Sequence, residues 1–451
     1  MRDTQPSMSL PPRGSILITG AHLLALDDAH TTGRFDVYCE EGEIREVAPR
    51  ITRRNVDHQI DGSGSIAMPG LVQAHVHLCQ TLFRASAEEL ELLDWLKTRI
   101  WPLEGALDAP AMRASARLGI AELLLGGTTS VLDMGSVHHT DELFRAADEL
   151  GLRYTGGKTL MDAGEDHPES LRESTEDAVA QSVELCERWH GRADGRLRYA
   201  FSPRFVLSAS EEAVRACVAE ARRRGAILHT HSSESRGEIE VVQARTGLRN
   251  VVLLHELGFT GSDVVLAHGV WLSPEERHIL RESRTTITHC PSANLKLGSG
   301  IAPVEELLSE GIRVALGADG AACNNTLDGF WELRLAALLH KARGGPRALP
   351  ALTALHMATG NGARALGLAN LGSIAVGQRA DLILLDTHRP HLFPQRGDLA
   401  SRVVYSAKSA DVHAVIVDGR VLVEGGKLQA ADLDEILRRA DQAASALGLD
   451  R

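Results

Sequence analysis

A pair of histidines after an apolar run is the first feature of this sequence that could carry chemistry. The run covers residues 65–72, and His75 and His77 follow it, two positions apart. Side chains alternate between the two faces of a β-strand, so both imidazoles would point to the same side. Two such imidazoles are half of a tetrahedral metal site. Alone, the pair also fits two exposed or hydrogen-bonded histidines, so a metal site needs further ligands from elsewhere in the chain.

Further residues of metal-ligating and acid–base types stand at the ends of other strand-like runs. They are Arg204, His231, Glu234, His268, His289 and Asp319. In a barrel of parallel strands, the carboxyl ends of the strands meet at one mouth. Three histidines and an aspartate there would suit zinc or ferrous iron and leave a position for water. Taken singly, His268 could be a buried structural histidine and Asp319 could belong to an Asp-Gly turn. A structure without a metal site would need such an explanation for every one of these residues at once.

Two details favour a single metal ion. A binuclear hydrolase of this architecture would need a carboxylated lysine at the end of the fourth strand, and that strand ends at Arg204 and Phe205. Lys158, on the third strand, is the nearest lysine and is out of place.

In the pair His229 and His231, the spacing to Glu234 favours His231 as the ligand and a structural role for His229.

Eight apolar runs separated by helical patterns predict the strands that would position these residues. They cover residues 66–77, 128–134, 153–161, 197–205, 226–234, 264–270, 285–291 and 313–320. Eight parallel strands with intervening helices close a barrel of about 250 residues. The expected fold class is therefore α/β, with a TIM-type (β/α)8 barrel.

Both ends of the chain have short, alternating β patterns instead. Residues 15–24 and 35–48 alternate around a turn, and residues 412–424 read as a hairpin with Asp-Gly at its turn. We expect the two ends to form one small β-sandwich. The predicted division is a flexible tail (1–13), the sandwich (14–64 and 372–430), the catalytic barrel (65–371) and a C-terminal helix (431–451).

Composition excludes several classes of partner. The net charge of −12, from 48 basic and 60 acidic residues, argues against a nucleic acid or an anionic membrane. The six cysteines are scattered without a C-x-x-C pair, and this favours free thiols in a reducing cytoplasm. No apolar stretch reaches about 18 residues, and no secretory signal is apparent, so we expect neither a membrane span nor secretion. A small molecule is the expected partner.

Taken together, the motifs resemble the metal-dependent amidohydrolase superfamily, in the branch of adenosine-type, methylthioadenosine/S-adenosylhomocysteine, guanine and s-triazine hydrolases. The matching segments are residues 69–82, 126–134, 229–234, 267–272, 288–300 and 316–325. The resemblance implies one divalent metal, zinc or alternatively iron or manganese, held by His75, His77, His231 and Asp319. Homo-oligomers are common in the family, so we expect one here.

The same resemblance implies how the reaction would run. Asp319 would accept a proton from the attacking water, and hydroxide would add to the amino-bearing ring carbon. Glu234 would protonate the ring nitrogen and then the amine, which leaves as ammonia. His268 would contact the water or the tetrahedral centre and stabilise its charge.

The substrate is less well specified by the motifs. Glu104, in Trp101-Pro-Leu-Glu104, matches a glutamate that holds the ribose hydroxyls in nucleoside deaminases of this branch, although it would also be ordinary at a helix start. Arg204, Phe205 and Gln80 resemble guanine deaminases, where the arginine and phenylalanine hold and stack the purine; triazine hydrolases share the glutamine. Ala85 replaces the glycine usual after Arg84, so the loop shape there is open.

We expect a hydrolase that deaminates an adenine nucleoside such as 5'-deoxyadenosine, methylthioadenosine, adenosine or S-adenosylhomocysteine. A free-base guanine-type deaminase and an s-triazine dechlorinase or deaminase are the alternatives. A non-catalytic scaffold of the same fold is a rival from another class. Such scaffolds typically lose metal ligands, whereas this sequence keeps all four together with Glu234 and His268.

Overall fold

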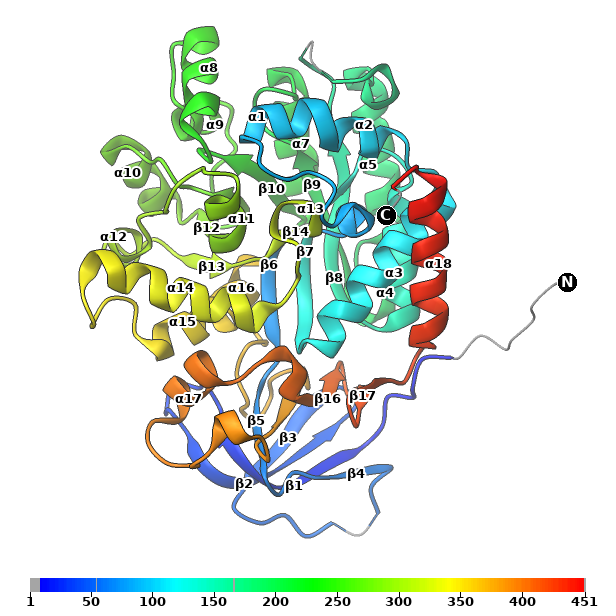
Figure 1. Ribbon diagram of the computed structural model, residues 1–451, viewed down its shortest axis with the longest axis vertical. Coiled ribbons are helices and arrows are strands. Elements are labelled where there is room, and N and C mark those ends of the chain that lie inside the picture. Colours follow the sequence, from blue (N-terminus) through cyan, green and yellow to red (C-terminus); the bar gives the residue numbers. More distant parts are fainter. Residues whose placement is uncertain (1–8, 54, 165–166, 450–451) are drawn as a thin grey trace, which may run out of the picture.

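Two nine-stranded sheets organise the computed structural model, which describes residues 9–53, 55–164 and 167–449 (Figure 1). The middle of the chain forms one sheet, and both ends together form the other. Residues 1–8 of the expected tail and the last two residues of the expected C-terminal helix lie outside the described residues.

The sheet from the middle of the chain is the predicted parallel barrel. Its strands are β6 (Leu71–His77), β7 (Thr128–Ser136), β8 (Arg153–Leu160), β9 (Leu197–Pro203), β10 (Ile227–Ser232), β11 (Val264–His268), β12 (Thr286–His289), β13 (Val314–Leu316) and β14 (Asp319–Gly320). Neighbouring strands pair in parallel from β6 through to β13. The eighth strand is divided: β13 pairs with β12, and β14, three residues further on, pairs with β6. This division closes the ring.

Helices surround the barrel, and the segment after β6 lies across the carboxyl ends of the strands (Figure 1). The helices are α1 (Leu92–Trp95), α2 (Trp101–Gly105), α3 (Ala109–Leu125), α4 (Thr140–Leu150), α5 (Thr175–Trp189), α6 (Arg192–Gly195), α7 (Glu211–Arg224), α8 (Arg236–Thr246), α9 (Asn250–Glu256), α10 (Pro274–Ser283), α11 (Pro291–Lys296), α12 (Val304–Ser309), α13 (Ala321–Asn324), α14 (Gly329–Gly344), α15 (Ala351–Met357), α16 (Gly360–Ala365), α17 (Leu399–Ser406) and α18 (Leu433–Ala446). Short turns η1 (Leu78–Phe83), η2 (Leu96–Ile100), η3 (Glu169–Leu171), η4 (Pro390–Leu392) and η5 (Ser409–Asp411) complete the helical elements.

Serine caps begin several of the helices that follow barrel strands. The side chains of Ser174, Ser210, Ser235 and Ser273 each accept a hydrogen bond from a backbone N–H in the first turn of α5, α7, α8 and α10. Each bond satisfies one of the donors that a helix start leaves without a partner.

The two ends of the chain form a single mixed sheet. Its strands are β1 (Ile16–Leu24), β2 (Thr32–Glu40), β3 (Glu43–Ala48), β4 (His58–Asp61), β5 (Ser65–Pro69), β15 (Leu382–Asp386), β16 (Val412–Val417), β17 (Arg420–Glu424) and β18 (Lys427–Leu428). Val37 of β2 and Val421 of β17 belong to one buried cluster although their strands stand far apart in the sheet. The sheet therefore bends around its own core, as expected of a small β-sandwich.

The chain passes from one sheet to the other at Gly70. The single strand predicted over residues 66–77 is two strands, because β5 pairs with β1 and β15 whereas β6 pairs with β7. A Cβ atom on Gly70 would lie 2.1 Å from the side chain of Thr129, so only glycine fits this approach. We propose that Gly70 is the boundary between the β-sandwich and the catalytic barrel. We also propose that the sandwich resumes at residue 372 and that the C-terminal helix follows it from residue 431. Helix α18 packs on α3 (Figure 1).

Within the described residues, no helix combines the length and the apolar character needed to cross a membrane. All six cysteines are buried and free.

Candidate active site

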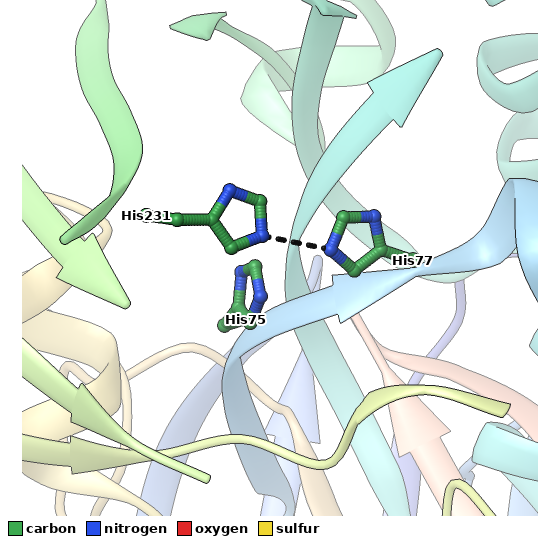
Figure 2. Close-up of side chains that lie close together, drawn as sticks. All are labelled: His75, His77 and His231. Carbon is green, nitrogen blue, oxygen red and sulfur yellow. Dashed lines mark hydrogen bonds between the residues drawn. The ribbon is translucent and has the colours of Figure 1, made fainter. Parts of the chain in front are cut away.

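The four predicted metal ligands meet at the mouth of the barrel. His75 and His77 end β6, His231 lies in β10 and Asp319 begins β14. Figure 2 shows the three imidazoles turned toward one another. The Nε2 atoms of His75 and His77 lie 3.3 and 3.4 Å from Oδ1 of Asp319, and the Nε2 atoms of His77 and His231 lie 3.1 Å apart.

In His231 and His75, the hydrogen bond made by Nδ1 determines that Nε2 is the nitrogen facing the centre of the site. Nδ1 of His231 lies 2.7 Å from the backbone oxygen of Arg204 and must donate to it. Nδ1 of His229 donates in the same way to the oxygen of Val265 at 3.0 Å, which leaves its Nε2 free to accept from Nδ1 of His75 at 2.8 Å. Both His231 and His75 therefore present an Nε2 lone pair to the centre of the site.

These donors fit a divalent cation. Nε2 of His75 is buried and has no hydrogen-bond partner among the described residues, and Nε2 of His77 faces another ring nitrogen. Burial, reinforced by the neighbouring His75, holds the pKa of His77 and of His231 well below the usual range. Neutral imidazoles are the ligating form. Converging nitrogen lone pairs and a carboxylate oxygen form the donor set of zinc.

Asp319 is the carboxylate of this centre and stays ionised. Burial alone would raise the pKa of Asp319, but His75, His268 and His77 outweigh burial and hold that pKa well below its usual range. Its Oδ2 lies 3.9 Å from Nε2 of His268, whereas its Oδ1 makes the contacts with the ligand histidines. Asp319 therefore faces both the metal centre and the space beside His268.

Glu234 and His268, which the sequence predicts to take part in the reaction, lie next to each other. Oε2 of Glu234 lies 3.4 Å from Nε2 of His268, and Oε1 accepts a hydrogen bond from the Ser299 hydroxyl at 3.3 Å. Nδ1 of His268 lies 2.9 Å from Oδ1 of Asn294, which orients the ring. Burial, and next the charge of Asp319, raise the pKa of Glu234 well above its usual range. The raised pKa favours the protonated form of Glu234, which is the form that a proton donor requires.

A pocket opens beside these groups at the mouth of the barrel. Its lining residues are His77, Gln80, Leu92, Trp95, Leu96, Arg204, Phe205, His231, Glu234, Glu238, His268, Leu297 and Asp319. The expected substrate-binding residues Gln80, Arg204 and Phe205 are thus at the cavity. Leu92 and Trp95 of α1 cover it, and sequence reasoning gave neither of them a role.

Glu104 lies behind the cavity wall and is not among its described lining residues. Arg204 binds it through both terminal nitrogens, with 3.1 Å between Nη2 and Oε1, and Gln80 donates to the same Oε1 at 2.8 Å. The side chains of the pair are only 4% and 7% exposed. From the sequence, Glu104 and Arg204 pointed to different substrates, whereas the structure joins them in one buried ion pair.

The structure gives roles to three residues near the site: sequence reasoning expected a structural role for His229, and it missed Asn294 and Glu238. His229 orients His75, Asn294 orients His268, and Glu238 accepts a hydrogen bond from the backbone of Glu234. The i, i+2 spacing of His229 and His231 was a signal that both rings face inward. Nothing comparable in the sequence marks Asn294.

Comparison with known proteins gives a consistent family. The sequence model of the protein family named Amidohydrolase family matches residues 66–422 of this chain. A 5'-deoxyadenosine deaminase of Methanosarcina acetivorans is 40% identical over 96% of this chain and 98% of its own length. A 5-methylthioadenosine/S-adenosylhomocysteine deaminase of Dictyoglomus thermophilum is 38% identical over 89% of this chain and 92% of its own. The solved adenosine deaminase of Xanthomonas campestris, with bound zinc, superposes with a TM-score of 0.89 at 30% identity, over 96% of this chain and 99% of its own.

Proposed function

The chain belongs to the amidohydrolase family, and from that premise we propose that it is a metal-dependent aminohydrolase of adenine nucleosides. It would hydrolyse the exocyclic amine of 5'-deoxyadenosine, methylthioadenosine, adenosine or S-adenosylhomocysteine and release the inosine analogue and ammonia. The observation that carries the proposal is the convergence of His75, His77, His231 and Asp319 beside Glu234, a carboxyl group whose pKa is raised. The names of the relatives support the substrate class.

His75, His77, His231 and Asp319 would hold one divalent ion, zinc in our proposal, with iron or manganese as alternatives. When bound, such an ion supplies a nucleophile from water at neutral pH by lowering the pKa of that water toward about 7. Zinc is present in the similar solved deaminase.

The protein's own groups would move the protons. Asp319 is ionised and can accept a proton from the attacking water at Oδ2, the oxygen that faces His268. The raised pKa of Glu234 favours its protonated form, which would deliver a proton to the ring nitrogen next to the amino-bearing carbon. His268, held by Asn294, lies between the two carboxyl groups and can stabilise the charge that develops on the adduct.

Substrate binding would use the cavity wall beyond the metal centre. Phe205 can stack on the purine, and Leu92, Trp95 and Leu96 supply an apolar cover that excludes water. Glu104 lies behind Gln80 and Arg204, so the ribose hydroxyls would have to reach it between these two side chains. Its Oε2 carries one hydrogen bond, from Arg204, and keeps acceptor capacity for them.

The test is ammonia release, with the product mass confirmed, from zinc-loaded protein. The panel is adenosine, 5'-deoxyadenosine, methylthioadenosine, S-adenosylhomocysteine, guanine and an aminotriazine. Turnover of the adenosines supports the proposal. Turnover confined to guanine or the triazine overturns it.

A guanine-type deaminase is the second candidate, because Gln80, Arg204 and Phe205 all line the cavity whereas Glu104 lies behind it. An s-triazine dechlorinase or deaminase shares Gln80 and remains the third. Against guanine, the Arg204 guanidinium is already bound at both terminal nitrogens by Glu104. We also propose a cytoplasmic location, in keeping with six free thiols, and a homo-oligomeric state.

A further inference from the structure

We propose that Glu238 is a positioning residue that fixes the backbone of the proton donor Glu234. The inference rests on the role proposed above for Glu234. It concerns a carboxylate that lies at the cavity and is only 1% exposed, but that the reaction itself does not use.

Glu238 binds the main chain of Glu234 directly. Its Oε2 accepts the backbone N–H of Glu234 at 2.7 Å, and its Oε1 accepts from the side-chain amide of Asn250. Asn250 is fully buried, so the carboxylate is held from both sides. Burial, and next the neighbouring Glu234, raise the pKa of Glu238 to about 7, and its oxygens can accept hydrogen bonds whether or not the group is ionised.

This hydrogen bond departs from the ordinary cap of a helix. Ser235 caps α8 and accepts from the N–H of Glu238 at 3.1 Å. A glutamate in that position normally returns the bond to the N–H of the capping serine itself. In α8 the carboxylate reaches one residue further back, to Glu234.

Helix α10 contains the ordinary arrangement and serves as an internal reference. Ser273 accepts from the N–H of Glu276 at 3.2 Å, and Glu276 accepts from the N–H of Ser273 at 2.8 Å. Glu276 is as deeply buried as Glu238. The two glutamates share their position in the cap and their burial. The Glu238 bond reaches Glu234, whereas Glu276 binds its own capping serine and also the Arg249 side chain and the N–H of Val251.

The residue before Glu234 is held as well. Ser233 has a φ of 56°, a left-handed conformation that costs free energy in a residue with a Cβ atom. Its carbonyl oxygen accepts from the N–H groups of Val270 and Trp271, at 2.9 and 3.1 Å. The loop after β11 thus fixes one side of the turn and Glu238 the other, so that the Glu234 carboxyl meets His268 and Ser299.

The experiment compares three variants under zinc-loaded conditions. Glu238→Met keeps the size and removes the acceptor, Glu238→Gln keeps an acceptor oxygen, and Glu276→Met makes the same change in α10. Asn250 can turn its side chain to suit the glutamine, because its Oδ1 has no hydrogen-bond partner among the described residues. Zinc content and thermal unfolding are measured for each variant.

We expect Glu238→Met to lower kcat by about 10- to 100-fold with KM little changed, because a small displacement of Glu234 penalises proton transfer more than binding. Glu238→Gln should stay within about threefold of the wild type, and Glu276→Met should lose stability but keep kcat. A rise in KM alone, an equal loss in the glutamine variant, or an equal loss of kcat in Glu276→Met would each overturn the proposal.

Amide hydrogen exchange at Glu234 tests the same inference without turnover. The N–H should exchange slowly in the wild type and in Glu238→Gln, and faster in Glu238→Met. Equal protection in all three would overturn the inference. If the wild type releases ammonia only from guanine or a triazine, the function proposal fails, and the kcat comparison is made on that substrate. If it turns over nothing, exchange alone decides.

Discussion

His268 and Asp319 face each other across the site, 3.9 Å apart, and both have a left-handed backbone. Their φ angles are 77° and 64°. Residues with a Cβ atom avoid this region at a cost of about 1–2 kcal/mol each, and glycine is the usual occupant. The fold accepts this strain at two functional side chains, and the left-handed turn aims both of them into the cavity.

Replacing His268 should separate the strain from the chemistry. Asparagine tolerates the left-handed region, so His268→Asn should unfold near the wild-type temperature while kcat falls about 100-fold, because the group that stabilises the developing charge is lost. His268→Val should in addition lower the free energy of unfolding by about 1–2 kcal/mol. Urea unfolding and ammonia release measure the two effects, and an active asparagine variant would exclude His268 from the reaction.

The pH dependence of turnover should report Glu234. Burial and the charge of Asp319 raise its pKa, so the proton that it donates persists above the usual carboxyl range. The activity that depends on this proton is present below the raised pKa and is lost as the pH rises through it. Turnover should therefore fall on the alkaline side, and Glu234→Gln should lower kcat by about 10²–10⁴-fold across the profile. A wild-type rate that climbs without a fall would contradict the assignment.

Local patterns predicted much of the barrel and the convergence of the four candidate metal ligands. Apolar runs ending in His75, His231 and Asp319 marked the carboxyl ends of strands, and a parallel barrel brings such ends together whatever their distance in the chain. The i, i+2 spacing of His75 and His77 fixed their common face. These conclusions needed only strand periodicity and closure of the ring.

Other features depend on the path of the backbone. The apolar run through Gly70 is continuous because both of its strands are buried, so periodicity did not reveal the change of sheet. Glu104 and Arg204 stand 100 residues apart, and nothing local predicts that their side chains pair. Ser235 to Glu238 and Ser273 to Glu276 have the same capping pattern in the sequence, yet the first glutamate binds the N–H of Glu234 and the second binds the N–H of its capping serine.

Ala85 should be a site of recoverable stability. Ala85 is exposed and has a φ of 60°, and it stands where the family that the sequence resembles usually has glycine. Ala85→Gly removes the Cβ penalty and should raise the free energy of unfolding by up to about 1 kcal/mol, measured by urea denaturation. Ala106, also exposed but right-handed with a φ of −92°, is the matched control. Ala106→Gly should destabilise by about 0.5–1 kcal/mol, and equal signs for the two changes would contradict the strain argument.

Removal of the metal should lower both activity and stability. A metal that binds only the folded state stabilises that state, so chelation should lower the unfolding temperature and zinc should restore it. His77→Asn should bring zinc per chain from about one to near zero, because an imidazole ligand is lost. His278→Asn, on the exposed surface of α10, should change neither quantity. Full zinc content in His77→Asn would remove His77 from the ligand set.

Glu104 decides between the nucleoside and free-base proposals. Glu104→Gln keeps the size of the side chain and weakens its bonds to Arg204 and to ribose hydroxyls, so KM for adenosine and 5'-deoxyadenosine should rise by about 10- to 100-fold, or about 1.4–2.8 kcal/mol. A 2'-deoxyadenosine substrate, which lacks one hydroxyl, should lose less than the ribonucleosides. An equal rise in KM for all nucleosides and for a free base would instead mean that the Glu104–Arg204 pair supports the cavity wall. Arg204, Phe205 and Gln80 would then be the residues that select the substrate.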